Sequence, residues 1–319
     1  MGIQNSIHAI LSELGLKAGA AGYDPQNAID RLAYGSFVSP ARRYFYMETP
    51  KAACTAFKHF IAVVEGVAVR DDALPYQRET RTEMLVHQRR HLAVANLINA
   101  DAPSRTAVLN GEAGWFIFAV VRNPFSRVVS FFENKIRLGE PGYRHLEARY
   151  GDPARHGGVR RAFGVFAEEV VADPSLRRGD YHLQSQAELI MPRLIPYSHI
   201  FRLEEADAAM KHFASHLGIP APAADWSYNR SPNFSRDWRC HYDARSAAIV
   251  ADAYREDFAL YDYDVSGWQG AAEADEPSAA DEYWRRELVA RNAMIDRLYS
   301  RLGVPPALNP AELRLIQSR

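Results

Sequence analysis

An unbroken apolar run over residues 115–121, WFIFAVV, is the feature that most constrains how this chain can fold. A continuous run is typical of a strand buried on both faces of a parallel sheet, whereas a half-exposed strand would alternate apolar and polar residues. Residues 122–124, Arg-Asn-Pro, follow, and then a helical pattern extends as far as Lys135. Proline fits the first turn of a helix, where its missing N–H is not needed. We therefore expect a buried strand, a turn and a helix.

The same order of elements occurs earlier in the chain. Residues 44–47 form a short aromatic run of strand character, and residues 48–50 have turn chemistry. Residues 55–67 then place apolar side chains on one helical face, namely Phe57, Phe60, Ile61 and Val64. A further strand is expected over 199–203, with helices over 163–173 and 205–217. Repeated strand-loop-helix units favour a layered α/β fold.

Charge and cysteine content narrow the class of protein. The chain has 38 Lys and Arg against 39 Asp and Glu, so its net charge does not indicate nucleic acid as a partner. Two cysteines, Cys54 and Cys240, cannot form a disulfide framework, which favours a reducing compartment. Residues 1–16 lack the apolar stretch of a signal peptide, and the most apolar run, 114–121, is shorter than the roughly 18 residues of a membrane span. We expect a cytoplasmic protein without a membrane span.

Composition divides the chain into four regions. Residues 1–40 are expected to form a helical lead-in, residues 41–265 the main domain, residues 266–282 an acidic linker and residues 283–319 a helical tail. Residues 139–161 contain five Arg against three acidic residues without clear periodicity, which indicates a long, mildly basic loop. Such a loop is either a solvated insertion or a holder for an acidic glycan or glycolipid head group.

The tail has heptad spacing. Leu288, Ile295 and Leu302 lie seven residues apart, and Trp284 and Leu298 occupy a second heptad position that Arg291 interrupts. We expect an amphipathic helix of about three heptads. It either forms a homodimer by pairing with its copy through residues 283–303 or packs back on its own domain.

The first strand-loop-helix unit has the chemistry of an anion site. Its loop lies within residues 50–58, PKAACTAFK, where small residues let the backbone approach an anion and Lys51 adds a positive charge. The loop GxxxxGK[ST] of nucleotide kinases is absent, which disfavours ATP chemistry of that type. Taken alone, the segment fits an ordinary turn with a surface lysine equally well.

The second unit adds a guanidinium and a hydroxyl. In residues 121–132, VRNPFSRVVSFF, Arg122 ends the buried strand and Ser130 lies about two turns inside the following helix. Both side chains could face one phosphate, for which they form a suitable clamp. An arginine in this place is otherwise a common cap or ion-pair partner.

Together the two loops resemble the sulfotransferases that use 3′-phosphoadenosine 5′-phosphosulfate (PAPS), specifically the membrane-bound carbohydrate sulfotransferases of the chondroitin 4-O and HNK-1 type. PKAACTAFK matches that family's PKxACTxxK, and VRNPFSRVVSFF matches VRxPFxRxVSxF, in the same order. Residues 180–186 (DYHLQSQ), 199–204 (HIFRLE) and 254–258 (YREDF) are more weakly similar to the family's EHWxxx, GKxETL and YxxDF. The resemblance covers about residues 43–264. We expect no counterpart of the family's Golgi anchor, and Leu183 stands where the family has its tryptophan.

The resemblance implies a fold, a reaction and a donor site. The fold is a P-loop-like central parallel sheet flanked by helices, and the reaction moves a sulfuryl group from PAPS to a hydroxyl of a carbohydrate or glycolipid acceptor, leaving 3′-phosphoadenosine 5′-phosphate (PAP) without a metal. Lys51 would stabilise the departing oxygen, and Cys54 would serve by its small size. Lys58 would assist or be solvated. The implied donor-binding residues are Lys51, Ala52, Ala53, Cys54, Thr55, Lys58, Arg122, Ser130, Arg230 and Arg236.

A histidine is the natural base for the acceptor hydroxyl, since its pKa suits proton abstraction near neutral pH. His91 is preferred because HLAVANL resembles the family's HVSANL, and His87 would share its face if residues 84–97 are helical. His182 is the next candidate, or it contacts the acceptor instead. Each could also be a structural histidine. His87 and His91 have metal spacing but lack the glutamate of HExxH, so a zinc site is not expected.

Two other functions remain open at this stage. One is a P-loop kinase-like phosphotransferase, which would need Mg²⁺ and a nucleoside triphosphate. The other is a catalytically silent glycan-binding or scaffold protein that keeps the fold.

Overall fold

The computed structural model describes residues 22–67, 86–87, 92, 94–222, 237–269 and 278–303. These residues form two compact units that alternate along the chain. Of the described residues, the first unit holds 22–67, 86–122 and 186–222, and the second holds 123–185 and 237–303. The predicted α/β class is confirmed by the first unit, which contains a sheet with parallel strands flanked by helices.

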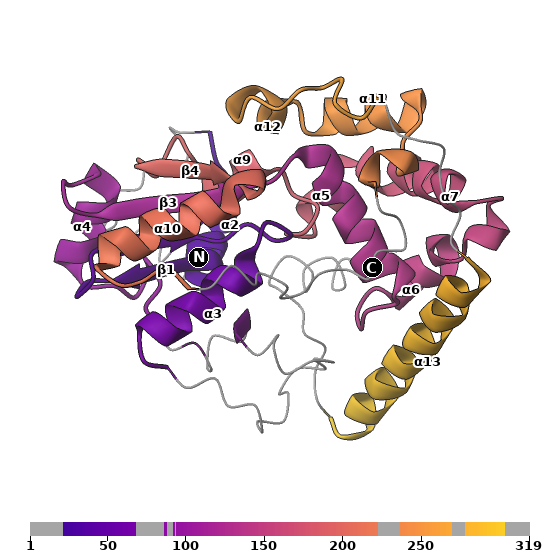
Figure 1. The fold of residues 1–319 in the computed structure, drawn as a ribbon, viewed down its shortest axis with the longest axis horizontal. Coiled ribbons are helices and arrows are strands. Elements are labelled where there is room, and N and C mark those ends of the chain that lie inside the picture. The colour runs from indigo at the N-terminus through magenta and orange to yellow at the C-terminus, as the bar shows by residue number, and fades with distance from the viewer. Residues whose placement is uncertain are drawn as a thin grey trace, which may run out of the picture. The chain divides into compact units, whose positions relative to one another are not determined.

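The sheet of the first unit has four strands in the order β1, β2, β3, β4. β1 (Ser36–Ser39) runs antiparallel to β2 (Tyr44–Met47), whereas β3 (Phe116–Val121) and β4 (His199–Arg202) continue parallel to β2 (Figure 1). Every residue of β3 is buried, as its unbroken apolar run predicted. Strand β1 was not predicted, and the helical lead-in expected to residue 40 ends at Gly35 instead.

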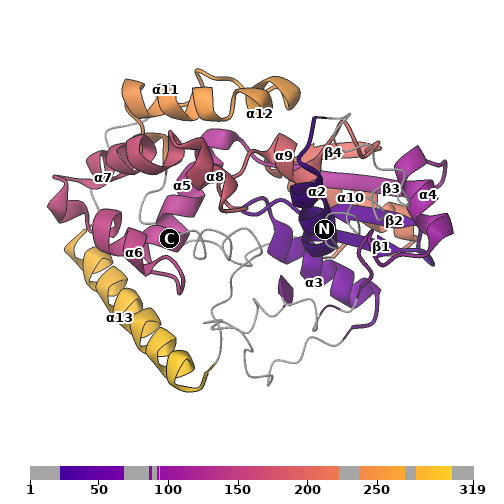
Figure 2. The same cartoon turned by 180° about the vertical axis from the view of Figure 1, so that it is seen from behind.

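Aromatic side chains fill one face of this sheet. Helices α3 (Cys54–Val64) and α10 (Ala206–Leu217) cover that face (Figure 1). The ring of Phe213 in α10 packs on Phe116 and Phe118 of β3, with ring centroids 5.7 and 4.8 Å apart. The opposite face carries α2 (Pro25–Gly35), seen in front of the sheet in Figure 2. Burial of this aromatic layer fixes where the carboxyl ends of β2 and β3 lie.

The remaining elements of the first unit border the sheet. They are α4 (Ala102–Asn110), α9 (Gln186–Ile190) and the short 3₁₀ helix η6 (Leu203–Glu205). The helix expected over residues 84–97 is wrong in the described part. Val86 and His87 lie in a 3₁₀ turn, and Ala95 forms an antiparallel bridge with Val38. Edge pairing with β1 outweighs the local helical pattern there.

In the described residues of the second unit, the regular secondary structure is helical. Helix α5 (Pro124–Phe131) runs directly into the π-helix η2 (Phe132–Arg137). Its other elements are α6 (Arg144–Leu146), η3 (Glu147–Gly151), η4 (Pro153–Arg155), α7 (Val159–Phe166), η5 (Ala167–Val171), α8 (Pro174–Arg178), η7 (Trp238–His241), α11 (Ala244–Ala253), α12 (Arg255–Leu260) and α13 (Ala279–Arg301).

The loop expected over residues 139–161 is therefore wrong, because short helices occupy most of it. Tyr143, Tyr150 and Val159 are buried in the core of the unit and anchor these helices. The hydroxyl of Tyr150 also donates to the Glu169 carboxylate at 2.6 Å. These contacts join residues far apart in the sequence, so local periodicity gave no sign of them.

Candidate active site

The loop between β2 and α3 has a strained backbone. Lys51 and Ala53 have φ angles of 68° and 56°, the left-handed region that costs a non-glycine residue roughly 1–2 kcal/mol. Such strain clusters at functional sites. Helix α3 also begins without a side-chain cap, whereas Asp24 and Asp101 cap α2 and α4. The first N–H groups of α3 and the positive end of its dipole therefore face the loop.

Arg122 joins this loop from the end of β3. Its Nη1 donates to the carbonyl oxygen of Lys51 at 3.1 Å, across 71 positions of sequence. Its backbone is held by the buried Gln186, whose Oε1 accepts from Arg122 N and whose Nε2 donates to Arg122 O, both at 2.7 Å. The structure thus brings the two predicted anion loops together at one edge of the sheet.

A buried ion cluster lies beneath the loop. Glu48 follows β2 and contacts the guanidinium of Arg31 at 3.5 Å and the ammonium of Lys58. All three side chains are almost fully buried. The alternative of a solvated Lys58 is therefore wrong. Its ammonium is instead part of the support that holds β2, α2 and α3 in place around the loop.

His87 is bound at both ring nitrogens. Lys58 Nζ lies 2.9 Å from its Nδ1, and Thr55 Oγ1 lies 2.9 Å from its Nε2. An ammonium can only donate, so Nδ1 accepts and the ring proton of neutral His87 is on Nε2, facing the Thr55 hydroxyl. The hydroxyl of Thr55 is itself buried and used in this contact.

One group in the described part of the chain could hold a metal ion: ligand atoms of Glu48, Cys54 and His87 lie within 4.8 Å of one another. The ammonium of Lys58 already contacts Glu48 and His87. It therefore supplies, next to these two side chains, the positive charge that a metal ion would otherwise bring. Burial raises the pKa of the Cys54 thiol, which disfavours the thiolate that a metal or a nucleophile needs.

The second unit holds the third histidine candidate in an Asp-His pair. His182 Nδ1 lies 2.9 Å from Asp180 Oδ1, and the hydroxyl of Tyr143 donates to Asp180 Oδ2 at 2.9 Å. Burial alone would raise the pKa of Asp180, but the charge and hydrogen bonds of His182 and the bond from Tyr143 hold it below its usual value. An ionised Asp180 fixes the proton of His182 on Nδ1 and leaves the lone pair on Nε2.

The turn that carries His182 is held at three carbonyl groups. Arg127, buried in α5, donates to Tyr181 O at 3.1 Å and to Gln184 O at 2.7 Å. The hydroxyl of Tyr254 donates to Leu183 O at 2.7 Å. Arg127 belongs to VRNPFSR and Tyr254 to YREDF, so residues from three of the segments that resemble the family meet at this turn.

For the other predicted donor and base residues that fall in the described ranges, the structure gives burial and location but no contact that indicates a role. Ala52 and Cys54 are buried in the first loop and Ala53 is half-buried there. Ser130 is half-buried on α5, whose N-terminus is capped by the Asn123 side chain. His91, Arg230 and Arg236 lie outside the described residues.

Comparison with known proteins agrees with this arrangement. Residues 34–264 match the model of the Sulfotransferase family. This chain belongs to the sulfotransferase family. The resemblance drawn from the two loops is thereby confirmed, together with the class of enzyme that it implied.

Several curated relatives of this sulfotransferase carry related names. Carbohydrate sulfotransferase 8 of Homo sapiens is 27% identical over 228 residues, covering 68% of this chain and 49% of the relative. Carbohydrate sulfotransferase 10 of Xenopus laevis is 25% identical over 259 residues, covering 74% and 68%. The Danio rerio protein of that name is 24% identical over 261 residues, covering 74% and 67%. The chain spans about half the length of the first of these relatives. No solved structure matched.

The expectation of a cytoplasmic protein is contradicted by these relatives. They are named carbohydrate sulfotransferases, and the resemblance of this sequence to that type implied membrane-bound Golgi enzymes. The expectation of a cytoplasmic protein is therefore withdrawn. Among the helices in the described ranges, none has both the length and the hydropathy of a membrane span.

Sequence reasoning missed several residues of this sulfotransferase that hold the two loops and His182 in place. Glu48 and Gln186 support the two loops, while Asp180, Tyr143 and Arg127 support His182. Arg127, Asp180 and Gln186 stand inside quoted segments, so their place there was a usable signal. Nothing around Tyr143 in the sequence distinguished it.

Proposed function

We propose that this protein transfers a sulfuryl group from PAPS to a hydroxyl of a carbohydrate or glycoconjugate acceptor. The observation that carries the proposal is the hydrogen bond from Arg122 to the backbone of Lys51, which unites two separated motif loops. The acceptor class follows the names of the relatives, which are carbohydrate sulfotransferases.

The chemistry of the first loop suits a doubly anionic donor. Lys51, the N–H groups at the start of α3 and the Arg122 guanidinium are all positive groups at one edge of the sheet. In this proposal the loop of residues 50–55 acts as a P-loop-like cradle for the phosphosulfate, and Arg122 binds the 3′-phosphate. Ser130 stays a predicted donor contact from its motif. Arg230 and Arg236 stay predicted donor contacts from their late place in the domain.

Lys51 is assigned to the leaving group. As the sulfuryl group moves, the bond from sulfur to the bridging oxygen breaks and negative charge builds on that oxygen of PAP. A positive group that is fixed in advance stabilises this charge without reorganising during the reaction. The left-handed backbone at Lys51 and its contact with Arg122 supply such fixing.

His87 is assigned a positioning role. Its Nδ1 lone pair already accepts from Lys58 and its Nε2 faces Thr55, so it links the loop to the buried ion cluster. A base needs a lone pair directed at the proton that it takes.

His182 is assigned to proton transfer. With Nδ1 bonded to Asp180, its Nε2 lone pair can accept the proton of an acceptor hydroxyl while the hydroxyl oxygen bonds to sulfur. Asp180 then stabilises the charged ring, the logic by which a carboxylate supports a catalytic histidine. The role is proposed from contacts within the second unit, and His91 stays a prediction from its motif.

We also propose that α13 is the amphipathic helix expected from the heptad spacing, with apolar side chains along one stripe and with Arg285 and Asn292 buried on another side. Its contacts concern assembly and not the chemistry of transfer.

The experiment incubates the full chain with ³⁵S-labelled PAPS and a panel of carbohydrates. We expect labelled carbohydrate from the natural protein, a loss of at least about 100-fold in Lys51→Ala, and no change in Lys211→Ala, a control at an exposed lysine of α10. Binding of glycan without transfer of label would favour a silent scaffold. Transfer of phosphate from ³²P-labelled ATP with Mg²⁺ would favour the kinase-like alternative and contradict the proposal.

A further inference from the structure

Helix α13 is attached to its unit by polar side chains. Its buried positions are Arg285, Asn292 and Ala293. Arg285 Nη1 donates to Arg137 O at 3.1 Å, and Asn292 Nδ2 donates to Leu138 O at 2.8 Å. These carbonyls lie at the end of η2, where a helix leaves carbonyl groups without internal partners. The attachment therefore uses the polar side of α13.

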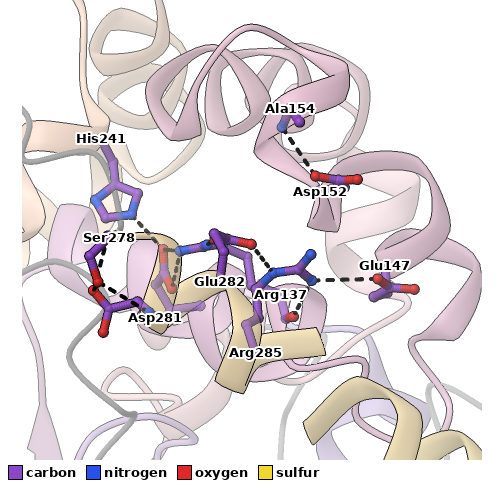
Figure 3. A network of polar contacts seen from close by, with 10 residues as sticks. Arg137, Glu147, Asp152, Ala154, His241, Ser278, Asp281, Glu282 and Arg285 are labelled. Carbon is purple, nitrogen blue, oxygen red and sulfur yellow. Dashed lines mark hydrogen bonds and ion pairs between the residues drawn. The ribbon is translucent and has the colours of Figure 1, made fainter. Parts of the chain in front are cut away.

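An ion network fixes the rotation of α13 about its own axis. Glu282 pairs with both Arg137 and Arg285, and Arg285 also reaches Glu147 at 3.6 Å (Figure 3). The partners stand on η2 and η3, so the helix is held from two elements. Because Arg285 and Asn292 are seven residues apart, the same side of α13 faces the unit over two turns.

The apolar stripe of α13 is left on the surface by this attachment. Trp284, Leu298 and Leu302 are 63%, 47% and 74% exposed. Leu288 and Ile295 are half-buried between them, and Arg291 lies at the middle of the stripe. The spacing of these residues alternates between four and three, which is the seam of a coiled coil. Among the described residues of its own unit, this seam is left largely uncovered, and it has the pattern of a surface that pairs with another helix.

We propose that the stripe of α13 pairs with the same stripe of a second copy of this chain, in antiparallel orientation. Side chains then meet in complementary layers across a two-fold axis. Trp284 of one copy packs on Leu302 of the other, Leu288 packs on Leu298, and Arg291 lies beside Ile295. Each layer occurs twice in the pair.

Charge along the edge of the stripe favours this orientation. The antiparallel register places Glu287 of one copy opposite Arg301 of the other, and Met294 opposite its own copy at the two-fold axis. A parallel pair in register would place Arg291 against Arg291 inside the seam, where like charges are destabilising. Antiparallel pairing separates these guanidinium groups by about four residues, or roughly 6 Å along the helix.

The pairing rests on contacts within the second unit and does not depend on the sulfotransferase activity. It is tested by sedimentation velocity of the full chain at micromolar concentrations. We expect a dimer for the natural protein, a monomer for Leu298→Glu and a dimer for Arg297→Glu, a control at the neighbouring exposed position. A natural protein that is still monomeric at about 100 μM, roughly ten times a Kd of about 10 μM, would overturn the proposal.

Charge exchange tests the register. Glu287→Arg and Arg301→Glu should each weaken the dimer, and the double variant should restore it because the pair is then reversed and not lost. Both positions are exposed, so these variants should fold even if Leu298→Glu does not. Failure of the double variant to restore the single losses would overturn the assigned register.

Disulfide capture tests the orientation. Under mild oxidation Met294→Cys should form a covalent dimer, whereas Leu288→Cys should not. In an antiparallel pair the two Leu288 positions are separated by about ten residues along the helix axis. The opposite result would indicate a parallel pair and contradict the proposal. Natural Cys54 and Cys240 are buried, so background crosslinking should be low.

Discussion

The two units each contain a buried glutamate held by positive side chains, and the two glutamates serve different purposes. Glu48 in the first unit contacts Arg31 and Lys58. Glu133 in the second unit contacts Arg137 at 3.0 Å and His241 at 2.7 Å. Both carboxylates are removed from water, so each depends on its partners for stability.

The difference lies in what surrounds each cluster. The cluster of Glu48 supports a loop that adds further positive groups, Lys51 and Arg122. The cluster of Glu133 continues through Arg137 to Glu282 of α13, so positive and negative groups alternate. Buried charge thus supports the proposed anion site in one unit and fastens a helix in the other. Burial of charge does not by itself indicate a binding site. What indicates one is the set of groups that a buried ion cluster holds in place.

The largest expected effect separates these two roles. Glu48→Gln and Glu133→Gln each leave buried cations without their carboxylate, so each should lower the free energy of unfolding by about 3–5 kcal/mol. Only Glu48→Gln should also abolish PAP binding. Urea denaturation measures the free energy of unfolding, and calorimetry on the folded fraction measures PAP binding. Equal loss of PAP binding in both variants would break the comparison.

The pH dependence of stability should come from the second cluster. Burial alone would lower the pKa of His241, but hydrogen bonds to Cys240 and Glu133 and the charge of Glu133 raise it to about 9. The resulting stabilisation is complete below the unfolded pKa of about 6.5 and is lost as pH rises through 9, a loss of about 3 kcal/mol. Urea denaturation across this range measures it. His241→Gln should flatten the curve, and an unchanged curve would contradict the assignment.

The proposed base should affect turnover alone. His182→Asn should lower kcat by about 100-fold, since general-base catalysis contributes 10²-fold or more. Asp180→Asn should lower kcat by a smaller factor, because the histidine remains but loses its fixed proton. PAP affinity, measured by calorimetry, should stay within twofold in both. If His91→Asn loses turnover and His182→Asn does not, the base is His91.

The smallest effect concerns Ser130. Loss of one hydroxyl contact to a phosphate should weaken PAP binding by about 1 kcal/mol, or roughly fivefold. Ser215→Ala at an exposed position of α10 is the control and should bind as the natural protein does. An unchanged affinity for Ser130→Ala would place its hydroxyl outside the donor site.

Sequence reasoning succeeded where the signal is local. β3 follows from its apolar run, and the loops of Lys51 and Arg122 follow from their motifs. It failed for β1, a four-residue strand with serine at both ends, whose pairing with β2 decides its structure. It also missed the polar attachment of α13, because Arg285 and Arg137 lie 148 positions apart. Such contacts depend on the whole fold.

The central claim is that Lys51 and Arg122 bind one donor. Calorimetric titration with PAP in the absence of Mg²⁺, on the natural protein, Lys51→Ala, Arg122→Ala and the double variant, tests it most directly. We expect the natural protein to bind, each single variant to lose at least tenfold in affinity, and the double variant to lose less than the sum of the two free energies, because neighbouring groups are coupled. Absence of binding to the natural protein, or natural affinity in both single variants, would contradict the claim.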